Sequence, residues 1–339
     1  MIDLVALGEA LIDFTQDPTL EGEPIRYTQH PGGAPANVLA MAARLGKSTA
    51  FIGCVGKDAF GAFLKETMVQ AGIDIQGLVS SPRYPTTLAF IHSDEHKDPS
   101  FSFYREGAAD IHLSPKDLPL ALLKKTRIFH FGSLSLTHDP ARKATLEALD
   151  LARGNGSVIS YDPNYRATLW ASEKKAQESI ASVLARVDIL KVSQKEMVLL
   201  TGEEDWVRGS SILMGQGPRL VLVTRGGGGA FFRNRRGYGR MAAFPVRVLD
   251  TTGAGDAFMG SFLSQFLETG KAPENLSPKE LAAMVRFANA SGGLTTTRPG
   301  ALSALPTQEE LNAFVAEHEK EAQMLPDDPT ASTGCNPRA

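Results

Sequence analysis

Residues 250–260 read DTTGAGDAFMG and place a glycine-rich turn directly before a carboxylate and an apolar stretch. Phenylalanines and leucines follow at helical spacing over residues 257–269, so the turn is predicted to lie at a helix N-terminus. The first backbone N–H groups of a helix lack intrahelical partners, and the helix dipole is positive there. Gly253 and Gly255 let the backbone approach an anion closely. The turn is therefore predicted to hold a phosphate-like group.

The carboxylate of Asp256 needs a separate explanation, because an anion site repels a second negative charge. One task that fits is to accept the proton of an alcohol that attacks a phosphorus atom. Phosphoryl transfer needs positioning, charge neutralisation and a base aimed at the nucleophile. The alternative is that Asp256 only caps the helix, since Asp is favoured at N-caps. The spacing leaves both interpretations open.

The composition describes an ordinary globular protein and excludes several classes. The chain has 339 residues, 42% hydrophobic and 22% charged, which suits one large α/β domain or two smaller ones. A formal charge of −3 and a pI near 6.2 give no basic field for nucleic acid or an anionic membrane. Cys54 and Cys335 are too few and too far apart for a metal knuckle or a disulfide framework. No apolar run approaches the ~18 residues of a membrane helix, and the N-terminus does not resemble a signal peptide. We expect a cytoplasmic protein with no nucleic-acid or membrane partner.

Short apolar runs alternate with segments of helical periodicity along the chain. Helices are predicted at residues 36–46, 58–72 and 141–154. Strands are predicted at residues 3–8, 49–56, 127–134, 158–164, 187–193 and 219–226. Buried strands joined by helical crossovers favour an α/β fold with a doubly wound, mainly parallel sheet.

Two stretches break this rhythm. Residues 14–31 and 84–105 carry aromatic and β-branched residues with turn formers and no helical period, so we expect antiparallel strands that form a small lid outside the main sheet. Residues 321–339 are rich in Pro, Asp, Ser and Thr and are predicted to be a disordered tail. The expected organisation is a single domain over residues 1–320 followed by this tail.

Other glycine motifs are weaker candidates for a phosphate site. The Gly-Lys-Ser at residues 46–48 fails as a P-loop, because Met41 stands where the upstream glycine is required. The TRGGGGA run at residues 224–230 precedes a predicted hairpin at 231–244 rather than a crossover helix. The alternative that this run forms a loop beside a bound nucleotide is left open. A dinucleotide oxidoreductase is disfavoured, since no N-terminal glycine fingerprint is followed by an acidic residue about 20 positions later.

Two long motifs carry a family resemblance. PGGAPANVLAMAARLG at residues 31–46 and DTTGAGDAFMGSF at 250–262 resemble, in order and separation, the two signatures of the ribokinase-like (PfkB) carbohydrate kinases. The resemblance covers residues 1–320, and segments such as GEALIDF and LKVSQKEMVLLTG are most similar to bacterial fructokinases. It implies a ribokinase-like three-layer α/β/α fold, with a central mainly parallel sheet and a small β-sheet lid over a sugar. It also implies ATP-dependent phosphorylation of a primary hydroxyl, with D-fructose as the expected acceptor.

The resemblance also implies catalytic and sugar-binding residues. Asp256 would be the base, and Arg166 would reach the transferred phosphate, for which a guanidinium is well suited. The anion hole would be formed by Gly253, Ala254 and Gly255. The sugar would be held by Asp13, Gly32, Gly33, Asn37, Phe103 and Arg105. Without the family resemblance, each of these residues also has a structural interpretation. Asp13 and Asn37 are compatible with helix capping, and the pair Gly32 and Gly33 with a plain turn. Arg105 is compatible with a solvated arginine on the lid. His130 is interpreted as a core residue.

For the nucleotide, the resemblance implies a further set of contacts. ATP would be bound by Lys191, Ser193, Glu196, Thr224, Gly226, Gly229 and Asn289. Glu196 would hold Mg²⁺ through water, since Mg²⁺ usually keeps several of its waters. Backbone oxygens for K⁺ would come from Asp250, Thr252, Thr295, Arg298, Gly300 and Ala304. Arg225 departs from the apolar residue usual in the family and receives no role.

Several alternatives stay open. The alternative acceptors to fructose are 2-keto-3-deoxygluconate, ribose, tagatose phosphate and a nucleoside. Arg26 and Arg105 are the obvious lid cations that keep the keto-acid alternative. A non-catalytic sugar sensor is disfavoured, because Asp256 and the glycine cradle are both retained. Residues 84–92 are apolar enough to allow a homodimer through the lid.

Overall fold

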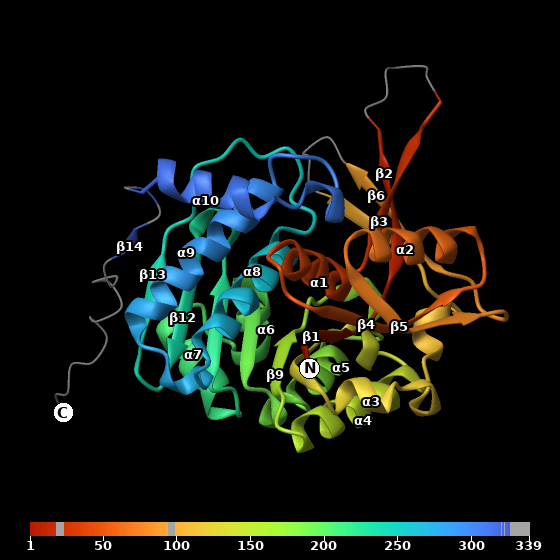
Figure 1. Cartoon of the computed structure of the whole chain (residues 1–339), viewed down its shortest axis with the longest axis horizontal. Helices are drawn as coiled ribbons and strands as arrows, with labels where there is room; N and C mark the ends of the chain where they lie inside the picture. Colours follow the sequence, from red (N-terminus) through yellow and green to blue (C-terminus); the bar gives the residue numbers. More distant parts are fainter. Residues whose placement is uncertain (18–23, 94–98, 320, 322, 326–339) are drawn as a thin grey trace.

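The computed structural model describes residues 1–17, 24–93, 99–319, 321 and 323–325, and in this part of the chain it has two sheets (Figure 1). The larger sheet has ten strands in the order β14-β13-β12-β11-β10-β9-β8-β1-β4-β5. Its strands are β1 (Ile2–Leu7), β4 (Thr49–Gly56), β5 (Ile73–Ser81), β8 (Thr126–Gly132), β9 (Val158–Asp162), β10 (Ile189–Ser193), β11 (Leu220–Thr224), β12 (Ala230–Asn234), β13 (Gly237–Met241) and β14 (Met324–Leu325).

The pairing of this sheet is parallel from β5 to β11 and antiparallel from β11 to β14. The predicted mainly parallel sheet and the predicted hairpin after the TRGGGGA run are therefore confirmed. Strand β14 corrects one prediction. Because Met324 and Leu325 pair with β13, the tail expected to be disordered from residue 321 is ordered at these two positions. Residues 326–339 lie outside the described residues.

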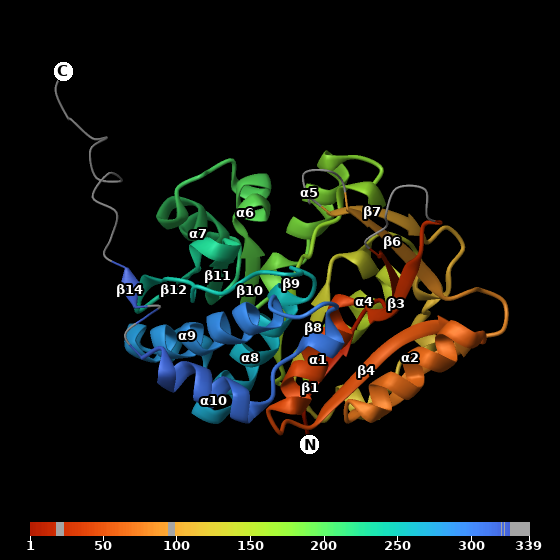
Figure 2. The same cartoon turned by 90° about the horizontal axis from the view of Figure 1, so that it is seen from above.

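Helices cover both faces of the large sheet (Figure 2). They are α1 (Ala34–Arg44), α2 (Ala59–Gln70), α3 (Leu120–Leu123), α4 (Ala141–Gly154), α5 (Glu173–Ala181), α6 (Gln194–Thr201), α7 (Trp206–Gly215), α8 (Ala254–Thr269), α9 (Pro278–Thr295) and α10 (Gln308–Glu317). Within β1, Leu4 and Ala6 join one apolar core with α1, α8 and α9, whereas Val5 and Leu7 join a second core with α4 and α5. Successive residues of a strand point to opposite faces, so the continuous apolar strands build two cores and three layers. None of the described helices is long and apolar enough to cross a membrane.

The smaller sheet forms the lid. Its strand order is β3-β2-β6-β7. The strands are β2 (Leu11–Gln16), β3 (Tyr27–Gly32), β6 (Thr87–Ser93) and β7 (Pro99–Tyr104). A separate sheet at these positions was predicted and is confirmed, but the expected antiparallel pairing is wrong for β2 and β6, which are parallel. The reason is topological, since β2 continues from β1, β6 follows β5, and β1 and β5 run in the same direction.

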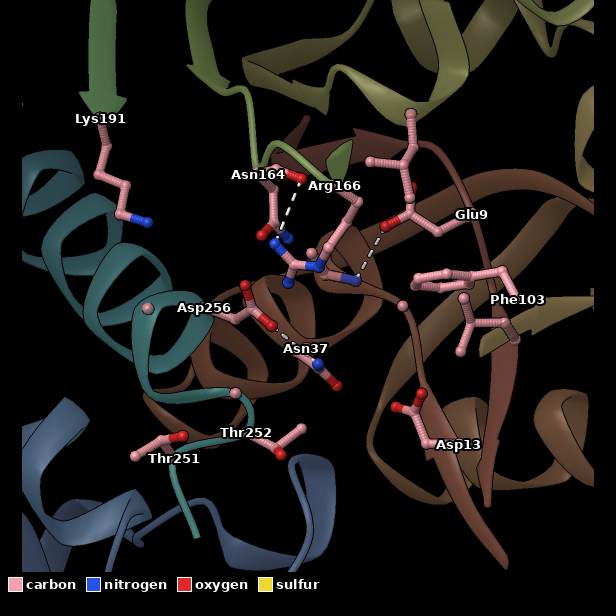
Figure 3. A pocket seen from close by; sticks show the side chains of 16 residues that line it. Glu9, Asp13, Asn37, Phe103, Asn164, Arg166, Lys191, Thr251, Thr252 and Asp256 are labelled. Atoms are coloured by element: carbon pink, nitrogen blue, oxygen red, sulfur yellow. Dashed lines mark hydrogen bonds between the residues drawn. The ribbon is translucent and has the colours of Figure 1, made fainter. Parts of the chain in front are cut away.

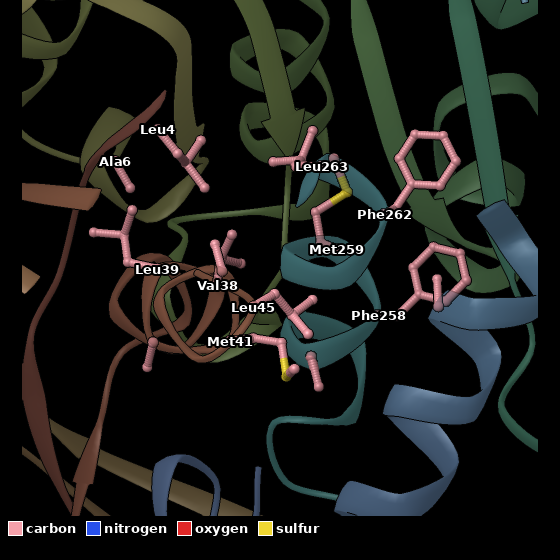
Figure 4. Close-up of a cluster of buried hydrophobic side chains, with 14 of the residues drawn as sticks. Leu4, Ala6, Val38, Leu39, Met41, Leu45, Phe258, Met259, Phe262 and Leu263 are labelled. Carbon is pink, nitrogen blue, oxygen red and sulfur yellow. The ribbon is translucent and has the colours of Figure 1, made fainter. Parts of the chain in front are cut away.

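Close packing of α1 against α8 positions the site (Figure 4). A Cβ at Gly260 would lie 2.5 Å from the carbonyl oxygen of Val38 and 2.7 Å from Cβ of Met41, so only glycine allows this approach. Around it, Met259, Phe262 and neighbouring apolar side chains are fully buried. The contact brings the first turns of α1 and α8 together, and each of these turns contributes to the pocket described next.

Candidate active site

A polar pocket lies between the large sheet and the lid (Figure 3). Of the residues predicted for the site, it is lined by Asp13, Gly33, Asn37, Phe103, Arg166, Lys191, Thr252, Gly253, Gly255 and Asp256. These residues come from β2, β7 and β10, from the loop after β9, and from the N-terminal ends of α1 and α8. The carboxyl ends of parallel strands are where open α/β sheets bind ligands.

A second pocket opens on the other side of the α8 N-terminus. It is lined by the predicted nucleotide residues Thr224, Gly226, Gly229 and Asn289, and by apolar side chains such as Phe244, Val246 and Phe258. No charged side chain is among its described lining residues. Thr251 and Gly255 belong to both pockets, so the two cavities meet at the predicted anion hole.

Asp256 does not cap its helix. The N-cap of α8 is Gly253, at φ +77°, and Asp256 is the third helical residue. Its carboxylate accepts a hydrogen bond of 2.8 Å from Nδ2 of Asn37, and the residue is 9% exposed. Burial raises its pKa to about 6, against the Asn37 hydrogen bond, which lowers it. The capping alternative is therefore wrong for Asp256 and for Asn37, and the carboxyl has the near-neutral pKa that suits a general base.

Gly253 is required by space and by its positive φ, whereas a side chain at Gly255 would crowd only the flexible end of Lys191. A Cβ at Gly253 would lie 2.8 Å from Cβ of Ala301, and one at Gly255 would lie 3.1 Å from Nζ of Lys191. The amide of Ala254 already donates a long bond of 3.3 Å to the carbonyl oxygen of Thr251. An anion bound here would have to compete with that bond.

Lys191 lies beside the same turn and forms a buried ion pair with Asp162, at 2.8 Å between Nζ and Oδ2. Burial alone would lower the pKa of Lys191, but Asp162 and Glu196 outweigh this effect and the net shift is upward. Asp162 was not among the predicted site residues, although it is a charged residue at the end of a buried strand. The ammonium therefore stays charged next to Gly255.

Arg166 follows β9 and enters the pocket above Asp256 (Figure 3). Its Nη1 donates to the carbonyl oxygens of Asn164 and Tyr165, at 3.4 and 3.2 Å. Asn164 has φ +47°, a conformation that Asn tolerates better than most residues. This turn directs the guanidinium toward the catalytic end of the pocket.

Two carboxyl groups, Glu9 and Asp13, lie on the side of the pocket away from Lys191 (Figure 3). Burial raises the pKa of each to about 7. Oε1 of Glu9 accepts from the amide of Ala34 at 3.1 Å, so this residue, which the sequence analysis missed, caps α1 from outside the helix. A Cβ at Gly32 would lie 2.1 Å from Oδ2 of Asp13, so Gly32 leaves room for that carboxyl although it does not itself line the pocket.

Arg105 differs from both expectations for it. It is 5% exposed and does not line the pocket, so it is neither a direct sugar contact in this structure nor a solvated lid arginine. Nε donates to Oδ2 of Asp110 at 2.7 Å, Nη1 to Oγ1 of Thr137 at 2.8 Å and Nη2 to the carbonyl oxygen of Leu134 at 2.9 Å. Leu134 is a pocket residue, so Arg105 supports the pocket wall from behind.

Three predicted nucleotide residues have structural bonds of their own. Ser193 and Glu196 form a capping box at α6, and Oε1 of Glu196 also accepts from the amide of Tyr165 at 2.7 Å. Neither Ser193 nor Glu196 lines either of the two pockets. Nδ2 of Asn289 donates to the carbonyl oxygens of Met241 and Ala242. This pair of bonds orients the amide beside the apolar pocket.

The predicted K⁺ residues come from two segments that lie side by side. Oδ1 of Asp250 accepts from the amide and hydroxyl of Thr252, and Oδ2 accepts from the amide of Gly300 at 2.8 Å. The Arg298 guanidinium pairs with Glu310. Because a guanidinium is itself a cation, the predicted K⁺ ligand at this position is the backbone carbonyl. Within the described residues, no group of three or more His, Cys, Asp or Glu side chains could hold a metal ion.

His130 is a core residue, as expected. It is 2% exposed, and its Nδ1 lies 2.8 Å from Oγ of Ser160. Burial lowers its pKa to about 3, so it stays neutral. Arg225 is exposed, and nothing in the structure explains its presence.

Comparisons with known proteins agree with this geometry. Residues 1–308 match the family described as pfkB family carbohydrate kinase. Fructokinase-1 of Zea mays is 40% identical over 315 residues, which cover 91% of this chain and 96% of the Zea mays protein. A crystal structure of fructokinase from Xylella fastidiosa with bound ATP has a TM-score of 0.86 and 32% identity, and the match covers 94% of this chain and all of that one.

A further solved structure contains a sugar. A double mutant of the fructokinase of Vibrio cholerae O395, in a form with fructose, ADP and potassium bound, has a TM-score of 0.83 and 32% identity. The match covers 92% of this chain and 98% of that chain. Both similarities extend over more than nine tenths of this chain.

Proposed function

The chain belongs to the PfkB family of carbohydrate kinases, and we propose that it transfers the γ-phosphoryl group of ATP to the primary hydroxyl O6 of D-fructose. The observation that carries the proposal is the meeting of the two pockets at Gly255, directly beside Asp256. A polar cavity of sugar size and an apolar cavity suited to a base share one anion site there. The fructokinase names of the relatives support fructose as the acceptor.

The arrangement assigns a sequence of events to the residues. Asn37 holds the carboxylate of Asp256, which takes the proton from O6 as that oxygen attacks the γ-phosphorus. The bond between the γ-phosphorus and the oxygen of ADP breaks in line with the attack. Arg166, Lys191 and the amides at Gly253 and Gly255 offset the negative charge of the transferred group.

The acidic and backbone groups near the turn fit the expected cations in different ways. Mg²⁺ would neutralise the nucleotide phosphates. A carboxylate has about four acceptor positions, and three positions on Glu196 are taken by Tyr165 and Ser193. One position is left for a water, which supports the proposed water-mediated role. The K⁺ proposal rests on backbone carbonyls near Asp250 and Gly300.

The charge of the pocket argues against acidic acceptors. Glu9 and Asp13 line its sugar end, and Arg166 is the only arginine among its described lining residues. Arg105 is already paired with Asp110, and Arg26 is exposed. A carboxylate or phosphate on the acceptor would face two acidic groups without a free cation of its own. This argument disfavours 2-keto-3-deoxygluconate and tagatose phosphate and leaves ribose and nucleosides as neutral alternatives.

A coupled assay of ADP release with a panel of acceptors tests the proposal. The panel contains fructose, ribose, adenosine, 2-keto-3-deoxygluconate and tagatose 6-phosphate at equal concentrations. We expect the highest kcat/KM with fructose and fructose 6-phosphate as the product. A higher kcat/KM for any other acceptor would refute the assignment of fructose, while ADP release without sugar phosphate would refute phosphoryl transfer to a sugar.

We further propose that residues 1–320 form one folding unit. We also propose that two chains can pair through their lids. Phe14 and Phe90 stack at 5.0 Å between ring centroids on the lid sheet, and Tyr104, which packs on Phe90, is 66% exposed. Light scattering of the wild type and of Tyr104→Glu tests this pairing, since a charge in an apolar contact should favour the monomer.

A further inference from the structure

Asp162 is the last residue of β9, and Lys191 lies in the middle of the neighbouring parallel strand β10 and lines the polar pocket. They are 3% and 7% exposed, and Oδ2 of Asp162 accepts from Nζ of Lys191 at 2.8 Å. The second oxygen, Oδ1, accepts from the amide of Asn164 at 3.2 Å. The carboxylate is therefore held on two sides and defines where the ammonium lies.

That position is the junction of the two pockets. Nζ of Lys191 would be 3.1 Å from a Cβ built on Gly255, one of the two residues that line both cavities. A phosphoryl group that passes from the apolar pocket to the polar one must cross this point. An ammonium held here is a point charge that can accompany the group during transfer.

Lys191 has a second possible partner, because Asp256 is also a buried carboxylate at this junction. The charged groups that face Asp256 are Lys191 on β10, Arg166 after β9, Asp162 on β9 and Asp13 on β2. Lys191 and Arg166 lower the pKa of Asp256, while Asp162 raises it. If the ammonium moved to Asp256, it would leave the phosphoryl path and make the base weaker.

We propose that Asp162 is a positioning residue for phosphoryl transfer, which holds the ammonium of Lys191 at Gly255 and prevents it from pairing with Asp256. This inference rests on the proposed function, because it assigns the ammonium to the transferred phosphoryl group. Asp162 itself lines neither of the two pockets.

The test compares Asp162→Asn with Asp188→Asn. Asp188 bridges the same two strands at the opposite edge of the sheet, where its Oδ2 accepts from the amide of Ile159 at 2.8 Å, and it pairs with Arg219. The measurement is the pH profile of kcat and kcat/KM with fructose and MgATP. For Asp162→Asn we expect kcat to fall about 10²-fold, the scale for a displaced catalytic group. The acidic limb should also move to lower pH, because the base loses a neighbouring negative charge. Asp188→Asn should change neither kcat nor the position of the acidic limb.

A structural role alone predicts a different result. A fall in kcat with an unmoved acidic limb, or the same loss in Asp188→Asn, would overturn the inference. The double variant Asp162→Asn with Lys191→Met should be no slower than Lys191→Met alone, since Asp162 acts through the lysine. A further loss that is additive in free energy would also overturn it.

Lys191→Met supplies an independent readout if Asp162→Asn does not fold. With the ammonium removed, Asp256 loses a neighbouring positive charge that lowers its pKa, so the acidic limb should move to higher pH, and an unmoved limb would overturn the inference. A wild-type protein that phosphorylates no acceptor would refute the proposed function and this inference together. An active wild type with unchanged Asp162→Asn would refute this inference alone.

Discussion

Replacing Asp256 by asparagine separates its catalytic role from its cost to stability. The substitution keeps the size of the side chain, and the new amide oxygen can still accept from Nδ2 of Asn37. It removes the group that takes the proton from the sugar hydroxyl. General-base catalysis contributes typically 10²–10⁴-fold, so kcat in the ADP-release assay should fall by about that factor, with little change in KM for fructose.

The same variant should be more stable than the wild type at neutral and alkaline pH. Burial raises the pKa of Asp256 from 3.8 to about 6. At about 1.4 kcal/mol per pH unit, this corresponds to about 3 kcal/mol of destabilisation once the group is ionised. The sign follows from the raised pKa, because stability is fully present below pH 3.8 and is lost as the pH rises through about 6. Asp256→Asn removes that cost, so its advantage should be greatest above pH 7 and should shrink toward pH 4.

Chemical denaturation of both proteins at pH 4, 5, 6, 7 and 8 measures this difference, and the coupled assay measures kcat in parallel. The kcat/KM of the wild type should fall below pH 6 as Asp256 takes up a proton. Two results would refute the reasoning. One is a variant that retains wild-type kcat, and the other is a stability difference that does not depend on pH.

The other predictions concern single contacts. Gly255→Ala places a methyl group 3.1 Å from Nζ of Lys191, so kcat should fall while KM for fructose stays constant in the steady-state assay. Asp13→Ala removes a carboxylate at the sugar end of the pocket, so KM for fructose should rise at least tenfold with KM for ATP unchanged, and a rise in both would contradict the assignment. Arg105→Ala leaves the buried carboxylate of Asp110 without its cation, which should cost about 3–5 kcal/mol of unfolding free energy. Urea denaturation tests this cost, and a loss below 1 kcal/mol would show that the pair is not structurally important.

Periodicity and turn chemistry were sufficient for the outline of the fold. The apolar runs within β1 and β11 are short and continuous, as expected for strands buried on both faces. The turn at residues 253–255 was predicted from glycine spacing and lies at the N-terminus of α8. These features depend on local propensity and on neighbours within a few positions, which a single sequence displays directly.

Contacts between distant residues could not be predicted in the same way. Asn37 and Asp256 are 219 positions apart, and Lys191 and Asp162 are 29 apart. Their pairing follows from the packing of α1 on α8 and of β9 on β10. Arg105 was expected to contact the sugar or to be a solvated lid arginine, because no feature of its neighbours in sequence shows that Asp110 and Thr137 enclose it.

By itself, the sequence determined the layer architecture, the family resemblance and the anion-binding turn, because each depends on residue types at short and regular spacing. Only the tertiary structure decided which carboxylates are buried and what each one contacts. Burial and charge pairing depend on distances through space, and these set the pKa of Asp256 and the position of the Lys191 ammonium.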